Sequence, residues 1–162
     1  MPVTPEPVPF RLRLAGEDTI DTRGIRTVSY KVQGLLHLEG DTLALEWAVD
    51  QSTENVGIGG ISTDVKKFDY EELVVPLTWL TEVRLTRFPS RRLKLRARRL
   101  DAFDGVPAAR PGSVSLRIRY RDRHLARAMV EAIEEARVDA LEYTDPGLLD
   151  DGETPRRGTT FP

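Results

Sequence analysis

The sequence predicts a mainly β domain that ends in one amphipathic helix. Short segments in which apolar and polar residues alternate recur between residues 10 and 121, and Gly, Pro, Asn or Asp separate them. After Asp122, by contrast, apolar residues recur at three- and four-residue spacing, as on one face of a helix. The chain has 162 residues, the size of one domain with additional termini.

The N-terminal part predicts an arm followed by a long hairpin. Residues 1–9 contain four prolines, which favour an extended arm, and residues 10–14 alternate as a short strand. Residues 16–24 are polar and predict a loop. Residues 28–50 then alternate on both sides of a Gly-Asp turn and predict a hairpin, in which Gly34 marks a bulge or bend. We therefore expect an arm with a short strand at 1–24 and a folded domain at 25–143.

The rest of the domain predicts short strands, loops and the final helix. A Gly-, Ser- and Asn-rich loop is expected at 51–63 and a Gly- and Pro-containing loop at 101–112. The expected strands are 65–70, 73–77, 83–87, 92–98 and 114–121, with a turn at 78–82. A helix of about 20 residues follows Asp122, which is a good N-cap residue. Residues 144–162 are acidic and then polar, and they predict a tail.

Three segments resemble the bacterial pleckstrin-homology-like (PH/GRAM-type) domain proteins. They are the hairpin at 34–47, the Val-Pro-Leu strand and turn at 75–83, and the strand at 114–119 that leads into the helix. The resemblance implies a seven-stranded β-barrel or sandwich capped by the helix, and a role in binding lipid head groups, peptides or proteins. In the phosphoinositide-binding members the first hairpin turn is basic, whereas this turn carries Glu39 and Asp41. No site residue is therefore transferred from the family.

Charge is strongly segregated along the chain. The formal net charge is −2, but residues 84–127 contain fourteen Arg or Lys and three acids. Strand alternation places many of these cations on one outer sheet face, and this set forms the candidate anion- or partner-binding site: Arg84, Arg92, Lys94, Arg96, Arg98, Arg117, Arg119 and Arg121. Like charges opposite each other across strands are destabilising. The face is therefore either paired internally with acids of the helix and tails, or it binds an anionic partner.

Among anionic partners, an acidic protein surface is preferred. Arg greatly outnumbers Lys in this segment and forms bidentate contacts with carboxylates. Anionic lipid head groups are the second possibility, and the tails are expected to contact neighbouring subunits. Nucleic acid is disfavoured because single-strand binding uses exposed aromatic residues, while Tyr120 is expected to point inward and the sequence pI is about 5.8.

The sequence indicates a binding protein rather than an enzyme. Without cysteine it has no thiol nucleophile, thiolate metal site or disulfide, and its two histidines are far apart. The Gly57–Gly60 segment lacks a phosphate-loop pattern, and no serine lies in a nucleophile elbow. We therefore expect no catalytic residue, metal or cofactor.

The expected role is that of an accessory subunit. No apolar run is long enough to span a membrane. Because the absence of cysteine favours the cytosol, we expect a cytoplasmic protein, including a peripheral position on the cytoplasmic face of the membrane. There it would dock onto a larger respiratory, photosynthetic or transport complex. The alternative is a barrel at the membrane surface that binds a lipid or small ligand, with residues 51–69 as a lid.

Overall fold

The computed structural model describes residues 4–142. They form eight β-strands and one α-helix, with two short 3₁₀ turns, η1 and η2. The elements are β1 (Val8–Asp21), β2 (Gly24–Glu39), β3 (Thr42–Gly57), β4 (Gly60–Lys67), β5 (Glu71–Pro76), η1 (Leu77–Trp79), β6 (Leu80–Thr86), β7 (Arg92–Ala97), β8 (Ser113–Arg117), η2 (Tyr120–Asp122) and α1 (Arg123–Glu142). The predicted tail at 144–162 lies outside the described residues.

All eight strands belong to one antiparallel sheet with the order β4-β3-β2-β1-β8-β7-β6. The strand β5 pairs with the first half of β3, and β4 pairs with its second half. The mainly β fold with one C-terminal helix is confirmed. Two details differ from the expectation: the sheet has eight strands instead of seven, and within residues 4–142 it is not closed into a barrel.

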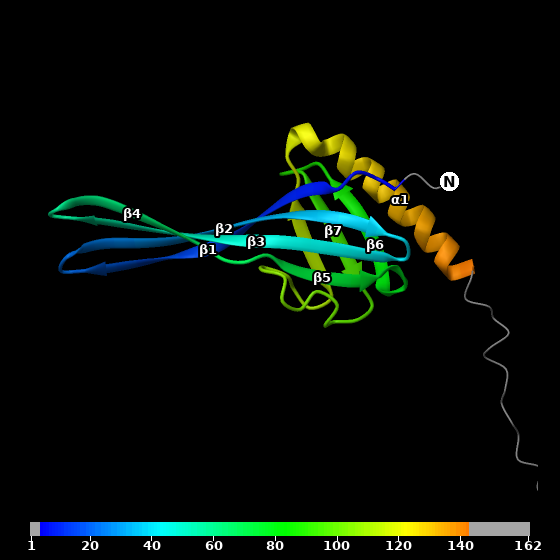
Figure 1. Cartoon of the computed structure of the whole chain (residues 1–162), viewed down its shortest axis with the longest axis horizontal. Helices are drawn as coiled ribbons and strands as arrows, with labels where there is room; N and C mark the ends of the chain where they lie inside the picture. Colours follow the sequence, from blue (N-terminus) through cyan, green and yellow to red (C-terminus); the bar gives the residue numbers. More distant parts are fainter. Residues whose placement is uncertain (1–3, 143–162) are drawn as a thin grey trace, which may run out of the picture.

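The folded body consists of two crossing layers and the helix (Figure 1). One layer contains β5 and the adjoining halves of β1–β3, and β6, β7 and β8 cross behind it. Buried side chains such as Phe10, Trp47 and Leu95 belong to one apolar cluster, which includes residues from both layers. The helix α1 packs against β6 and η1 and contributes Ala126, Met129 and Ile133 to this cluster.

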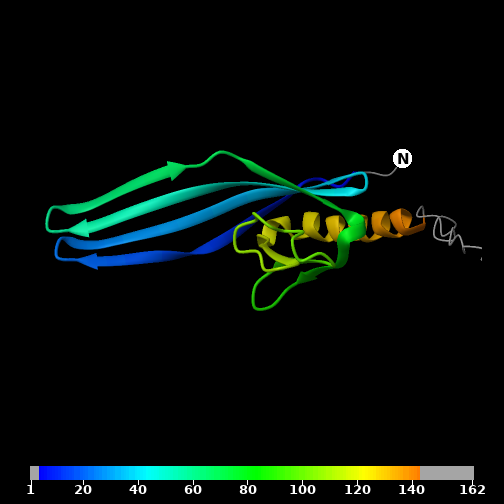
Figure 2. The same cartoon turned by 90° about the horizontal axis from the view of Figure 1, so that it is seen from below.

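A four-stranded extension projects away from the body (Figures 1 and 2). We call it the arm; it differs from the N-terminal arm predicted at 1–24. It consists of residues 15–28 and 50–67, which form two neighbouring hairpins. The loops predicted at 16–24 and 51–63 are therefore wrong, apart from the turns at 22–23 and 58–59. The hairpin expected at 28–50 is correspondingly part of a longer one, and the strand at 10–14 is part of the much longer β1.

Gly34 is not a bulge, because the register of β2 is continuous through it. It lies opposite Phe10 on β1 and Trp47 on β3. A Cβ atom at this position would overlap the backbone oxygen of Glu46 and the Phe10 ring. Glycine is therefore required here by close packing of the ring and the neighbouring strand.

Candidate functional site: the basic groove

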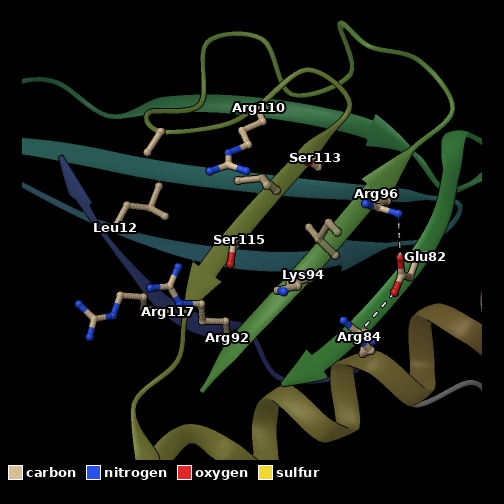
Figure 3. Close-up of a pocket in the computed structure, with 13 residues that line it drawn as sticks. Leu12, Glu82, Arg84, Arg92, Lys94, Arg96, Arg110, Ser113, Ser115 and Arg117 are labelled. Atoms are coloured by element: carbon tan, nitrogen blue, oxygen red, sulfur yellow. Dashed lines mark ion pairs between the residues drawn. The ribbon is translucent and has the colours of Figure 1, made fainter. Parts of the chain in front are cut away.

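A groove of about 800 Å³ lies over β6, β7 and β8 (Figure 3), and we call it the basic groove. Among the residues that line it are six cations and one carboxylate, that of Glu82. Five of the cations belong to the set predicted from the sequence: Arg84, Arg92, Lys94, Arg96 and Arg117. The sixth is Arg110.

Strand pairing explains why these cations gather. The three strands are direct neighbours, as the sequence argument required. Arg84 lies opposite Lys94, which lies opposite Ser115 on β8. Two residues closer to the start of β7, on the same face, Arg92 lies opposite Arg117. Because residues opposite each other in an antiparallel sheet share a face, the alternation of β6, β7 and β8 presents these cations together.

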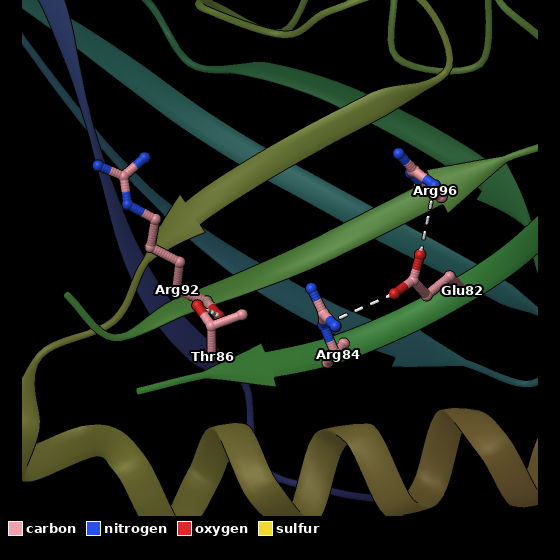
Figure 4. Close-up of polar contacts among 5 residues, drawn as sticks. All are labelled: Glu82, Arg84, Thr86, Arg92 and Arg96. Carbon is pink, nitrogen blue, oxygen red and sulfur yellow. Dashed lines mark hydrogen bonds and ion pairs between the residues drawn. The ribbon is translucent and has the colours of Figure 1, made fainter. Parts of the chain in front are cut away.

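Glu82 neutralises only part of this charge. Its carboxylate lies 3.6 Å from Arg84 Nε and 3.7 Å from Arg96 Nη1 (Figure 4). Arg92 Nε donates a hydrogen bond to Ser90 Oγ at 3.0 Å. Within residues 4–142, no ion pair involves Lys94, Arg110 or Arg117. The groove therefore keeps a strong positive charge, and internal pairing accounts for a small part of it.

Three residues of the predicted set lie outside the basic groove. Arg98 follows the end of β7, and its backbone N–H donates to the Trp79 carbonyl oxygen. Arg121 lies in η2, with its Nε 3.7 Å from Asp122 Oδ1. Arg119 lines a second groove. The prediction that Arg117, Arg119 and Arg121 share one outer sheet face is therefore wrong. The strand β8 ends at Arg117, so the two later arginines do not belong to the sheet.

The second groove adjoins the first and also has a volume of about 800 Å³. Arg117 lines both grooves, and Arg11, Lys31 and Arg119 extend the positive charge along the second. The set predicted from the sequence omitted Arg11, Lys31 and Arg110. The alternation around Phe10-Arg11-Leu12 already placed Arg11 on an outer face, and it pairs with Arg117. Arg110 lies in a loop region, where no strand phase could identify it.

Two buried polar atoms in these grooves have no hydrogen-bond partner within the described part of the chain. They are Ser115 Oγ in the basic groove and Arg11 Nε in the second groove. Buried polar atoms are normally hydrogen-bonded, so each such exception needs an explanation. Buried atoms of His37, Trp47 and Asp122, which line neither groove, are in the same state, so it is not specific to the grooves.

Tyr120 does not point inward as predicted. It lies in η2 and is 67% exposed. The guanidinium carbons of Arg91 and Arg123 lie 4.8 Å and 4.1 Å from the centroid of its ring. Because β8 ends at Arg117, strand alternation no longer directs Tyr120 into the core. Its ring instead forms a cation–π cluster at the surface.

Arg99 and Asp101 form a separate, self-contained ion pair. Arg99 Nε donates to Asp101 Oδ1 at 2.9 Å and Arg99 Nη2 donates to Oδ2 at 2.6 Å, while its guanidinium lies 4.3 Å from the Trp79 ring centroid. The hydrogen bonds from Arg99 are the main cause of a lowered pKa at Asp101, with a smaller contribution from the charge of Arg99. This arginine is consequently already occupied by an internal carboxylate.

The lowered pKa gives a pH prediction. We expect an NMR titration to place the midpoint of the Asp101 carboxyl below that of an ordinary aspartate, and Arg99→Gln to return it toward the ordinary value. Because the folded-state pKa is the lower one, the stabilisation is present above the unfolded-state pKa and is lost as the pH falls through the folded-state pKa. An unchanged midpoint in Arg99→Gln would contradict the assignment.

Residues 4–142 contain neither a metal-binding cluster nor a membrane-spanning helix. No group of three or more His, Asp or Glu side chains in this range could hold a metal ion. The described helices include none with the length and apolar character needed to cross a bilayer. Comparisons with family models, curated proteins and solved structures found no match for the chain.

Proposed function

We propose that this protein is a non-catalytic interaction module that docks through the basic groove onto an acidic surface of a partner protein, as an accessory subunit of a larger complex. The observation that carries the proposal is the gathering of six cations around one carboxylate in a single groove. Such a site attracts anions over several ångströms and fixes them with charge-assisted hydrogen bonds.

The chemistry of the groove favours carboxylates. Five of its six cations are arginines, whose planar guanidinium groups accept a carboxylate in bidentate fashion. The groove and its neighbour run over three strands and onto β1, which suits an extended acidic segment better than a single small anion. The carboxylate of Glu82 already forms ion pairs with two of these arginines, Arg84 and Arg96.

The test measures binding of a fluorescein-labelled peptide that contains eight glutamates, by fluorescence anisotropy. We expect the triple substitution Lys94→Gln, Arg96→Gln, Arg117→Gln to weaken binding by more than about tenfold. Each lost charge-assisted hydrogen bond is worth about 1.5–3 kcal/mol before desolvation. The fold should remain intact, because all three side chains point away from the core. Binding of the wild type should also weaken at high salt, as the Debye length shrinks from about 10 Å at 0.1 M to about 3 Å at 1 M.

Two controls separate the groove from general charge. A matched variant, Arg98→Gln, Arg121→Gln, Arg127→Gln, removes the same number of charges outside the groove and should change the affinity by less than about threefold. Glu82→Gln should strengthen binding, because it releases Arg84 and Arg96 from their internal partner. Equal weakening in both triple variants would refute the groove as the site. Tighter binding to phosphatidylserine vesicles than to the peptide would instead identify a lipid partner.

A further inference from the structure

The arm leaves one long strand edge without a partner. Within the described residues β4 pairs only with β3, and it forms one outer edge of the arm, while the second half of β1 forms the other (Figure 2). All eight residues of β4 are exposed. The backbone N–H and C=O groups on such an edge are a template for pairing with another strand.

The two edges of the arm are protected differently. The β1 edge carries Glu17, Asp18 and Asp21, and its register shifts between Leu14 and Glu17. Charged side chains and bulges disfavour edge pairing. The β4 edge carries charges only in its second half, at Asp64, Lys66 and Lys67, and it has neither a proline nor a register shift. The edge of β4 is therefore the one suited to accept a strand.

An apolar row crosses the arm and stops at this edge. Ile20, Ile25, Val56 and Ile61 lie directly opposite one another on four successive strands and so share one face. Val65 lies on the same face of β4, four residues from Ile61. Ile61 is 70% exposed and Val65 is 55% exposed. Both faces of the arm are in water, so these side chains gain burial only from another molecule.

We propose that two copies of this chain pair through their β4 strands, antiparallel and about a two-fold axis at Thr63. In this register Ile61 lies opposite Val65 of the second copy, and Val65 lies opposite Ile61 of the second copy. β-branched pairs of this kind stabilise antiparallel sheets. Asp64 then faces Ser62 and Lys66 faces Gly60 of the second copy, so no like charges lie opposite each other. The product is a continuous eight-stranded ribbon built from two arms.

Neighbouring registers are less favourable. An axis at Asp64 places two carboxylates opposite each other, which is destabilising. An axis at Val65 brings Asp64 opposite Lys66 of the second copy, but it leaves Ile61 beyond the paired residues and pairs a shorter part of β4. Because exposed ion pairs contribute little to stability, the gain from pairing Asp64 with Lys66 is smaller than the gain from burying Ile61. The register with its axis at Thr63 is therefore favoured. The dimer uses the arm and is independent of the basic groove on the body.

The chain lacks cysteine, so a single introduced cysteine reports the contact directly. In Thr63→Cys the two Cα atoms would lie about 4.5–5.5 Å apart across the axis, within the range of about 4.4–6.8 Å that a disulfide accepts. We expect mild oxidation to link this variant into a covalent dimer. Thr27 is the matched control, because it lies in the same row and on the same face as Thr63, two strands away. With strands about 4.8 Å apart, its two copies would be about 24 Å apart, so Thr27→Cys should cross-link at least about tenfold less.

Sedimentation equilibrium of cysteine-free chains gives a second measurement. Thr63→Lys places two ammonium groups opposite each other, and we expect the dimer dissociation constant to rise by at least about tenfold. Ser62→Lys, the neighbouring residue, faces Asp64 of the second copy and should leave the dimer intact or tighten it.

A wild-type chain that remains monomeric at about 100 μM would overturn the proposal. Equal cross-linking of Thr27→Cys would indicate face-to-face packing, and a disulfide in Val65→Cys but not in Thr63→Cys would place the axis elsewhere; either result refutes it.

Discussion

Replacing Ile133 with alanine is expected to lower the free energy of unfolding by about 2–5 kcal/mol. Ile133 is fully buried, and it belongs to the cluster that joins α1 to the sheet. The substitution removes three carbon atoms from the buried face of α1, the helix that packs against β6 and η1. The remaining cavity adds to the loss of apolar burial, so the cost exceeds the transfer term alone.

Urea unfolding followed by circular dichroism measures this effect. Val138→Ala is the control, since Val138 is on the same helix but is 53% exposed. It should change the free energy of unfolding by no more than about 0.5 kcal/mol. Similar small losses in both variants would mean that α1 does not pack on the sheet as described.

The elements that bury one face could be predicted from the sequence, and those that bury none could not. In β7, Leu93 and Leu95 are buried while Lys94 and Arg96 are exposed, so the alternation identified the strand to within one residue. The helix was predicted equally well from its apolar spacing. In the arm both faces meet water, so only a few apolar residues, such as Ile61 and Val65, mark one face and the period of two is weak. Glycine near the hairpin ends, as in Gly57 and Gly60, then made two strands resemble a loop.

The candidate site shows the same division. Its strand residues, such as Lys94 and Arg117, could be predicted from the alternation of side chains, once β6, β7 and β8 were assumed to be neighbours. Arg110 could not be found, because its position depends on how a loop folds back over the strands. Tyr120 was placed wrongly because the alternating pattern of β8 continues in the sequence for four residues after the strand has ended. Alternation specifies the face of a side chain only as far as the ladder extends.

The body and the arm consequently differ in what stabilises them. The body closes its apolar cluster with two layers and a helix, and its outer cations are tolerated because they are exposed and partly paired with Glu82. The arm has strand pairing but no second layer. A sheet of three or more strands needs a hydrophobic face or a packed helix for stability of its own, so a partner strand on β4 that buries Ile61 and Val65 would be favourable.

Gly34→Ala is expected to destabilise the body by about 2–3 kcal/mol, since forcing extra atoms into a packed core typically costs about 1–3 kcal/mol. The added methyl group would overlap the Glu46 backbone oxygen on β3, which cannot move without disturbing the ladder, and the buried ring of Phe10. Alanine recovers only part of this through the lower entropy of its unfolded chain. Gly59→Ala is the control, because a Cβ atom there meets nothing within 4 Å, and its effect should stay within about 0.5 kcal/mol.

A double-mutant cycle with Phe10→Leu tests the cause. Leucine lacks the ring atoms that the new methyl group would strike, so the cost of Gly34→Ala should be smaller in the Phe10→Leu background than in the wild type. The clash with Glu46 remains, which means that the recovery should be partial. Additive losses of the two substitutions would show that the ring does not determine the residue at position 34. Thermal unfolding at one protein concentration, followed by circular dichroism for all four chains, provides the comparison.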